Sequence, residues 1–432
     1  MSQKSRRVLL AVVAAASFWP PPAADAFPAF ARKYSLSCTA CHEAWPKLND
    51  FGRAFRDRGY RMGTGMDDPT DKPPAYWPIA IRTTPGYAYT RQNNVETDDG
   101  LRTIGSGTFE HPEIDILTGG TLGSKASFLA VIAGFGAEGT AQIESAWVRL
   151  DAIGGNPWLN LRVGKHELDQ PRSSHRPLTF TQDYLIYVYR PLEDQSLLHY
   201  DMGANQLGVE LSGHDDGSRT RYAVSFVDAN DAPGNNSIIS SPMLYGHVTR
   251  RFQPFSSGAL RQVRLGAFGT VGWAPTRFAT IGGEPIEGSG TSNQSYTRFG
   301  GDLSLWLGPS STPLAITVAV AHAHEARAFY GGTADATWTG GFLQAEYTPR
   351  IDLTLFGRYD WIRNGQQPLE ELSKNFDDRD AVTAGMRYTF SFSSRADVAW
   401  HVEFTDHRAK LVGPDGLDVT TKQFFTGIDF AF

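Results

Sequence analysis

From residue 73 onward, apolar and polar residues alternate with a period of two. In residues 206–212, Leu207, Val209 and Leu211 stand between polar residues or glycine, and residues 398–404 repeat this pattern. Successive side chains of a strand point to opposite faces, so this period predicts β-strands. The mean hydropathy is -0.32, and residues 8–19 form the only sustained apolar run. A bundle of membrane helices is therefore excluded, because each helix needs about 20 apolar residues.

About sixteen segments carry the alternation. A soluble β-sandwich also alternates and is the alternative. The polar face here bears charged residues and glycine in strand after strand, which is typical of the water-filled lumen of a barrel. The 44 glycines and an aromatic content of 12% are also typical of an all-β membrane barrel. We predict strands at 77–92, 112–122, 125–136, 140–153, 157–167, 204–213, 218–229, 239–253, 257–275, 292–308, 312–327, 332–348, 350–363, 378–393, 394–407 and 419–432.

Short turns alternate with longer links through most of the chain, and the longer links include 93–111 and 168–203. Outer-membrane barrels have short periplasmic turns and long external loops, and the aromatic C-terminus at Phe432 fits such a terminal strand. Link 168–203 is the longest. It is the third external loop by this count, and its resemblance to the third loop of porins, which often folds inward, implies an inward fold here; a solvated surface loop is the alternative. An inward loop places at a constriction its charged residues Arg172, His175, Arg176, Asp183 and Arg190.

Residues 1–26 predict a secretory signal peptide. Three basic residues precede the apolar run at 8–19, and an A-x-A pattern ends at Ala26. An uncleaved anchor is the alternative, but twelve residues are too few to span a bilayer. Cleavage leaves 37 basic and 45 acidic residues, a net charge of -8 against -6 for the whole chain, so charge gives no support to nucleic-acid binding.

The two cysteines of the chain both lie in the sequence Cys38-Thr39-Ala40-Cys41-His42. C-x-x-C-H is the attachment motif of c-type haem, in which two thiols bond the vinyl groups and the histidine binds iron. A disulfide or half of a zinc site is the alternative, yet the chain has no second cysteine pair to complete a zinc site. We therefore predict one haem c, with His42 as the proximal ligand.

Apolar residues follow the motif at spacings of three and four, namely Trp45, Leu48, Phe51 and Phe55. This spacing predicts one face of a helix, against which a haem would lie. The cytochrome segment then covers residues 27–72 and the barrel covers 73–432, so the segment is too small to enclose a haem alone. Met62 is the candidate distal iron ligand; Met66, a barrel histidine or an open position are the alternatives.

Two barrel features carry weaker hypotheses. His322 and His324 share one face of a predicted strand, where they would point into the lumen and bind metal or serve as polar wall. Residues 364–380 contain an acidic cluster that would attract cations at the outer mouth or simply be a solvated loop.

The stretch from Phe30 to Tyr60, with the C-x-x-C-H motif followed by Trp45-Pro46-Lys47-Leu48-Asn49, resembles the fused monohaem cytochrome–porins of the bacterial outer membrane. The best-known members are iron oxidases of Fe(II)-oxidising bacteria. The resemblance implies an all-β, sixteen-stranded antiparallel outer-membrane barrel of a Gram-negative bacterium, with a small α-helical cytochrome plug in its periplasmic half or in the lumen. It also implies that Cys38 and Cys41 attach the haem and that His42 binds its iron.

The function implied is one-electron transfer from extracellular Fe(II), or another small donor, to a periplasmic cytochrome, as an iron(II):cytochrome oxidoreductase. Outward electron delivery is one alternative, a transport porin with a haem-bearing gate or sensor is another, and a peroxidase-like haem enzyme is a third. The expected surroundings are outer-membrane lipid, with oligomer formation by analogy to trimeric porins.

Overall fold

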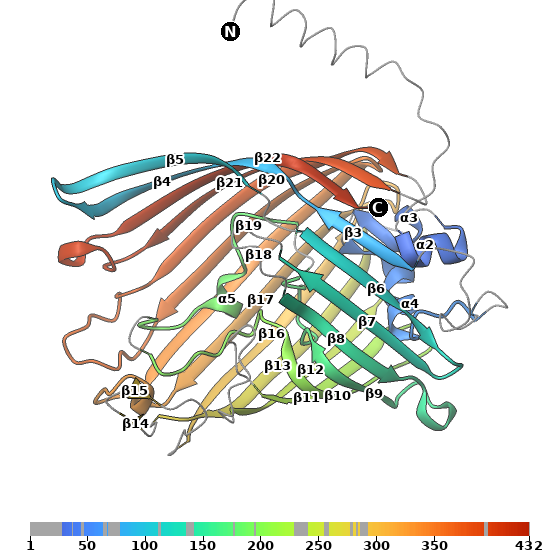
Figure 1. Cartoon of the computed structure of the whole chain (residues 1–432), viewed down its shortest axis with the longest axis horizontal. Coiled ribbons are helices and arrows are strands. Elements are labelled where there is room, and N and C mark those ends of the chain that lie inside the picture. Colours follow the sequence, from blue (N-terminus) through green and yellow to red (C-terminus); the bar gives the residue numbers. More distant parts are fainter. Residues whose placement is uncertain are drawn as a thin grey trace, which may run out of the picture.

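A closed antiparallel β-barrel makes up most of the molecule (Figure 1). The computed structural model describes residues 28–36, 38–44, 47–63, 67, 78–110, 114–134, 142–175, 178–193, 196–228, 241–254, 259–276, 280–281, 284–285, 293–392 and 396–431. The expected signal peptide 1–26 and the predicted domain boundary at 72 lie outside these residues. No helix in the described part is long and apolar enough to cross a membrane.

The strands of the wall are β3 (Ile79–Thr83), β4 (Gly86–Thr97), β5 (Gly100–Glu110), β6 (Ile114–Leu122), β7 (Ala126–Ala133), β8 (Gln142–Leu150), β9 (Asn160–His166), β10 (Gln206–His214), β11 (Thr220–Asp228), β12 (Pro242–Phe252), β13 (Leu260–Ala274), β16 (Gln294–Leu307), β17 (Leu314–Glu325), β18 (Ala336–Arg350), β19 (Leu353–Asn364), β20 (Arg379–Phe392), β21 (Asp397–Ala409) and β22 (Val419–Ala431). A separate two-stranded sheet joins β14 (Thr280–Ile281) and β15 (Glu284–Pro285).

Sixteen wall strands result, because four of these eighteen segments form two long strands. β4 continues β3 and β6 continues β5: β3 pairs with β6, β4 pairs with β5, and β22 pairs with both β3 and β4. The sixteen-stranded barrel is therefore confirmed. Link 93–111 was expected to be a loop, but the structure has a hairpin of β4 and β5 there, with its turn at Asp98 and Asp99.

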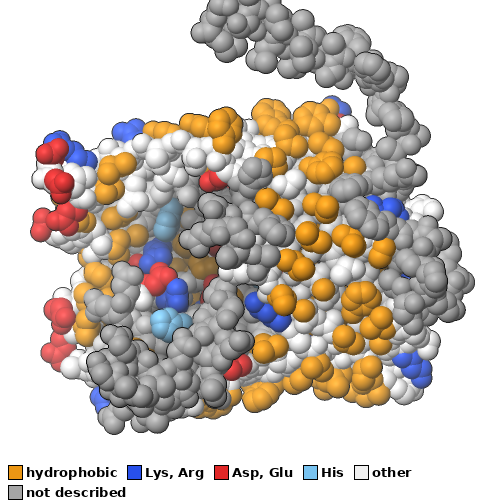
Figure 2. Space-filling view, viewed as in Figure 1, with side chains coloured by type: hydrophobic (Ala, Val, Ile, Leu, Met, Phe, Trp, Pro, Cys, Tyr) orange, Lys and Arg blue, Asp and Glu red, His pale blue; other side chains and the backbone are white. Residues whose placement is uncertain are grey.

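The alternation arises because each strand has one face toward the lumen and one toward the outside. On β21, His401 and Glu403 are buried in the lumen, whereas Trp400 and Phe404 are exposed on the outer surface. Large apolar side chains recur on the outer face of neighbouring strands, and Figure 2 shows them as extended orange patches. A band of this size is unfavourable in water, so it is the surface that lipid covers.

The β6–β7 turn, the β10–β11 turn and the end of β22 lie at one end of the barrel, which we call the short-turn end. The small N-terminal segment lies at this end (Figure 1). Its elements are α2 (Pro28–Tyr34), α3 (Cys38–Cys41), β1 (His42–Ala44), β2 (Lys47–Leu48) and α4 (Asp50–Asp57). Its aromatic side chains Tyr34, Phe55 and Tyr60 form a core with Trp147 of β8, so the barrel wall completes the fold of the segment.

Loop 168–203 runs from β9 to β10 through the lumen, as the sequence predicts. Its short helix α5 (Leu185–Val188) packs against β18 and β19. Tyr184, Tyr187 and Tyr189 of the loop are buried and share one hydrophobic core with Trp338 and Phe342 of the wall.

Candidate functional site

The C-x-x-C-H motif lies on the N-terminal segment at the short-turn end. Cys38 and Cys41 begin and end the single helical turn of α3, and His42 follows as the first residue of β1. Cys41 and His42 are half-buried, and the side chain of Cys38 lies outside the described residues. Burial raises the pKa of the Cys41 thiol to about 11. Reactive redox thiols have a lowered pKa, so this environment does not favour a redox-active use of the C-x-x-C pair.

Helix α4 holds the motif in place. Asn49 is its N-cap and accepts a hydrogen bond of 2.9 Å from the backbone N–H of Gly52. The backbone N–H of Asn49 also donates to the carbonyl of Cys41, at 2.9 Å, and its side-chain amide donates to that of Ala40, at 2.9 Å. A Cβ on Gly52 would lie 2.2 Å from the Cys41 oxygen, so only glycine permits this close approach.

The predicted single helical stripe from residue 45 to 55 is wrong in its extent, because α4 begins at Asp50 and Leu48 belongs to β2. Trp45 lies outside the described residues. Phe55 is 7% exposed within the aromatic core, whereas Phe51 is 41% exposed. Helix α4, which contacts the motif, therefore leaves the aromatic ring of Phe51 uncovered.

The candidate distal ligand Met62 packs against the aromatic core formed by Tyr34, Phe55, Tyr60 and Trp147. Its backbone N–H donates to Asp67 at 2.7 Å. Met66 lies outside the described residues. Met62 thus fills a packing role in this arrangement, and its ligation of iron stays a prediction.

The residues of the motif fit a covalently held haem. The two cysteine positions are one helical turn apart with the histidine next to them, and helix α4, which contacts Cys41 through Gly52, also carries the exposed ring of Phe51. The chemistry of the donor set is also appropriate, since thiols and imidazole are the groups that c-type haem uses. No set of three or more His, Cys, Asp or Glu in the described part forms an independent metal site.

Ion pairs seat the N-terminal segment in the barrel. Arg61 pairs with Asp151 at 2.7 Å, and Lys47 pairs with Glu346 of β18. Arg149 of β8 donates to the carbonyl oxygens of Arg56 and Asp57, at 2.8 and 3.2 Å. A cation at the last carbonyls of a helix is favourable, so the wall caps the C-terminus of α4.

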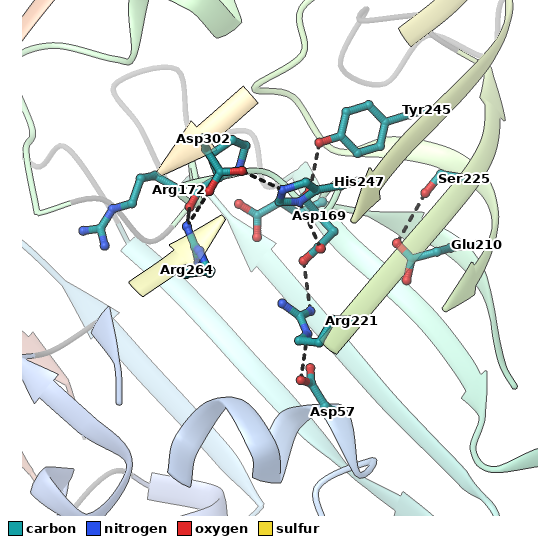
Figure 3. A network of polar contacts seen from close by, with 12 residues as sticks. Asp57, Asp169, Arg172, Glu210, Arg221, Ser225, Tyr245, His247, Arg264 and Asp302 are labelled. Carbon is teal, nitrogen blue, oxygen red and sulfur yellow. Dashed lines mark hydrogen bonds and ion pairs between the residues drawn. The ribbon is translucent and has the colours of Figure 1, made fainter. Parts of the chain in front are cut away.

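A buried series of charged groups connects α4 to the loop and to strands β11, β12 and β16 of the wall (Figure 3). The guanidinium of Arg221 on β11 lies 2.8 Å from Asp57 of α4 and 3.0 Å from Asp169 of the loop. His247 of β12 contacts Asp169 at 3.2 Å and Asp302 of β16 at 3.1 Å. Asp302 in turn accepts from Arg264, at 3.0 Å. The N-terminal segment and the loop therefore share one guanidinium.

Neighbouring cations hold the carboxylates of this buried series of charged groups in their ionised form. Burial alone raises the pKa of Asp57, but the charges of Arg221, Arg56 and His214 bring it below its ordinary value. Burial also raises the pKa of Asp169, but Arg221 and His247 outweigh it and leave this pKa well below the ordinary value. A buried carboxylate with such partners resists protonation, so the contact between segment and loop persists at neutral and mildly acid pH.

The charged residues predicted for a constriction are distributed over several places. Arg172 pairs with Glu346 inside the lumen, and His175 lies 3.0 Å from Glu144 of β8. Arg190 pairs with Glu193 within the loop, Asp183 is exposed, and Arg176 lies outside the described residues. The structure thus brings Arg172 and His175 to the lumenal wall.

Additional contacts of the loop with the wall were not predicted. Glu403 of β21 accepts from the backbone N–H groups of Phe180 and Thr181, each at 2.9 Å. The guanidinium of Arg358 on β19 donates to Thr179 and to the carbonyls of residues 182 and 183. These partners, like Asp57 and Arg221, are far apart in the sequence, and no local motif marks them.

The hypothesis that His322 and His324 face the lumen is wrong. Both are exposed on the outer face of β17, whereas Ala321 and Ala323 are buried on the inner face. His322 is hydrogen-bonded to Thr339 at 2.9 Å, and the imidazole of His324 lies 3.2 Å from Asp335. The lumenal face takes the small alanines because loop 168–203 fills the space beside them.

Comparison with known proteins supports the barrel. No protein-family model matches the chain, and no curated protein matches it. Among solved structures, the anion-selective porin from Comamonas acidovorans aligns with a TM-score of 0.50 and 11% identity over 82% of this chain and 98% of that porin. Two others are the outer membrane channel DcaP of Acinetobacter baumannii (TM-score 0.49, 10% identity, 82% and 97% covered) and OprB of Pseudomonas putida (0.48, 12%, 82% and 94%). At 11% identity the likeness to the Comamonas porin shows the fold alone: a porin-like outer-membrane barrel.

Proposed function

We propose that this protein transfers single electrons across the outer membrane by means of one covalently held haem c. The observation that carries the proposal is the C-x-x-C-H motif on a segment seated in the short-turn mouth of a porin-like barrel. Short turns of outer-membrane barrels face the periplasm, so the motif would meet periplasmic partners. Cys38 and Cys41 would hold the haem, His42 would bind its iron, and the group would supply one-electron redox chemistry.

The chain itself provides the rest of the conduit. The wall separates the lumen from lipid, and loop 168–203 narrows the route from the external side. Because the loop is fixed to β18, β19 and β21, it excludes bulky particles while small ions approach. We infer that the donor is a small soluble reductant, with extracellular Fe(II) as the leading candidate and a periplasmic cytochrome as the acceptor.

Two alternatives remain. Electrons would run outward if the acceptor is extracellular. A transport porin with a haem-bearing gate is favoured by the porin-like fold, but the packed aromatic core between loop and wall opposes a wide channel.

The first test is pyridine haemochrome spectroscopy of the purified full-length protein, expressed with the cytochrome c maturation system. We expect one haem per chain, and none in the Cys38→Ser/Cys41→Ser variant. Anaerobic stopped-flow mixing with Fe(II) then follows the reduced haem bands. Reduction by dithionite without reduction by Fe(II) would exclude iron as the donor, and a wild-type protein without haem would refute the proposal as a whole.

A further inference from the structure

A cavity of about 120 Å³ lies between the N-terminal segment and the start of loop 168–203. One water needs roughly 10–15 Å³ of such space, so the cavity admits several waters or one small polyatomic ion. Its walls carry two carboxylates, Glu167 and Asp169. They also carry six cationic side chains: Lys47, Arg53, Arg56, Arg172, Arg221 and Arg264.

The surface that faces this cavity is therefore cationic, although its basic residues have carboxylate partners. Asp50, Asp57, Asp302 and Glu346 accept from these cations, but none of the four lines the cavity. Of the two lining carboxylates, Asp169 accepts from Arg221 at 3.0 Å. The lining therefore holds an excess of guanidinium and ammonium donors over carboxylates. Such donors in a partly desolvated site are suited to an oxyanion.

The cavity adjoins the C-x-x-C-H motif. β1 pairs with β2 so that His42 is opposite Leu48 and Ala44 is opposite Lys47, and both β2 residues line the cavity. Gly52 of α4 is in close contact with the carbonyl of Cys41, and Arg53 and Arg56 follow it on the same helix. The basic cavity is consequently a direct neighbour of the candidate iron ligand.

We propose that this cavity is an oxyanion site. Its occupant is either the propionate carboxylates of the haem attached at Cys38 and Cys41 or a free oxyanion such as phosphate. The first occupant rests on the proposed function, whereas the second does not depend on it. Because lining residues come from both the N-terminal segment and the loop, the site is complete only when the segment is seated.

Arg56 is the side chain best suited to a test. It is among the less committed of the six cations, since its carboxylate partner Asp57 lies 3.4 Å away and is shared with Arg221 at 2.8 Å. Arg56→Gln removes the charge and keeps a similar length. Arg58→Gln is the matched control, because Arg58 is exposed, donates to the carbonyl of Asp216 and does not line the cavity.

The experiment titrates inorganic phosphate into full-length protein in detergent by isothermal calorimetry at low salt. Haem-loaded wild type, the haem-free Cys38→Ser/Cys41→Ser variant, and both backgrounds with Arg56→Gln or Arg58→Gln are compared. Heat-modifiable mobility on gels verifies that each barrel is folded. Haemochrome spectra report separately whether the proposed function holds.

Saturable phosphate binding by the haem-free protein but not by the loaded protein would assign the site to the propionates. Binding by both forms would assign it to a free oxyanion. In either case Arg56→Gln should weaken phosphate binding at least tenfold, and Arg58→Gln should leave it unchanged. Absence of saturable binding in both forms, or equal affinity of the Arg56→Gln and wild-type proteins, would overturn the proposal. If wild type carries no haem, the phosphate titration still decides whether the site exists.

Discussion

Replacing Arg221 by methionine should release the N-terminal segment while leaving the barrel folded. The Arg221 side chain is 17% exposed and lies between Asp57 and Asp169, which are 6% and 15% exposed. Removing one partner of a buried ion pair costs about 3–5 kcal/mol, since the remaining charges lose their compensation. At about 1.4 kcal/mol per tenfold, the ratio of seated to released segment should fall by roughly two to four powers of ten.

Limited proteolysis of the folded protein in detergent measures this ratio, because cleavage within 28–63 reports the released state. Arg219→Gln is the control: Arg219 belongs to the same hairpin, but its side chain is 67% exposed and lies 3.7 Å from Asp215. Exposed pairs of this kind contribute about 0–1 kcal/mol. Equal protease protection of Arg221→Met and wild type would refute the reasoning that the shared guanidinium holds the segment.

Three further outcomes are expected. The pKa of Asp57 is lowered in the folded protein, so its contribution to the stability of the seated segment is present above the ordinary carboxylate pKa of about 3.9 and is lost as the pH falls through the folded value. Protease protection of the segment should therefore be constant from pH 7 to 5 and decline only below about pH 4. Gly52→Ala should destabilise the segment by about 1–3 kcal/mol through overpacking and lower the haem content per chain, whereas Gly246→Ala, with open space beside it, should do neither. Glu403→Gln weakens two charge-assisted hydrogen bonds that hold loop 168–203 to the wall, each of about 1.5–3 kcal/mol. A loop held less firmly should obstruct the lumen less, so single-channel conductance in planar bilayers should rise. An unchanged conductance would show that this carboxylate does not fix the position of the loop.

The barrel was predictable because lipid and lumen impose opposite requirements on neighbouring residues of each strand. Trp400 and His401 illustrate this, since one is exposed to lipid and the next is buried inside. Strand β5 was missed because glycines at 100, 105 and 107 interrupt its apolar pattern. The structure explains two of them: the rings of Tyr89 and Tyr87 on β4 cover these positions and leave no room for a Cβ.

The motif residues were predictable, whereas their surroundings were not. C-x-x-C-H is a local pattern whose spacing states its chemistry, so Cys38, Cys41 and His42 could be named from sequence. Asp57 and Arg221 meet only because the barrel closes around the segment, and no spacing rule connects them. The facing of His322 and His324 was wrong for a related reason: period two fixes which residues share a face, but the packing of loop 168–203 decides which face is inside.

The seating of the N-terminal segment also determines an order of events during biogenesis. This segment precedes the wall strands in the chain and is synthesised before them, yet the side chains that receive it come from β8, β11 and β18. Those contacts have large sequence separation and form only after most of the wall is assembled. A part of the chain that is synthesised before the wall strands is thus seated after most of them have assembled, and any group attached to it beforehand would be carried into the barrel with it.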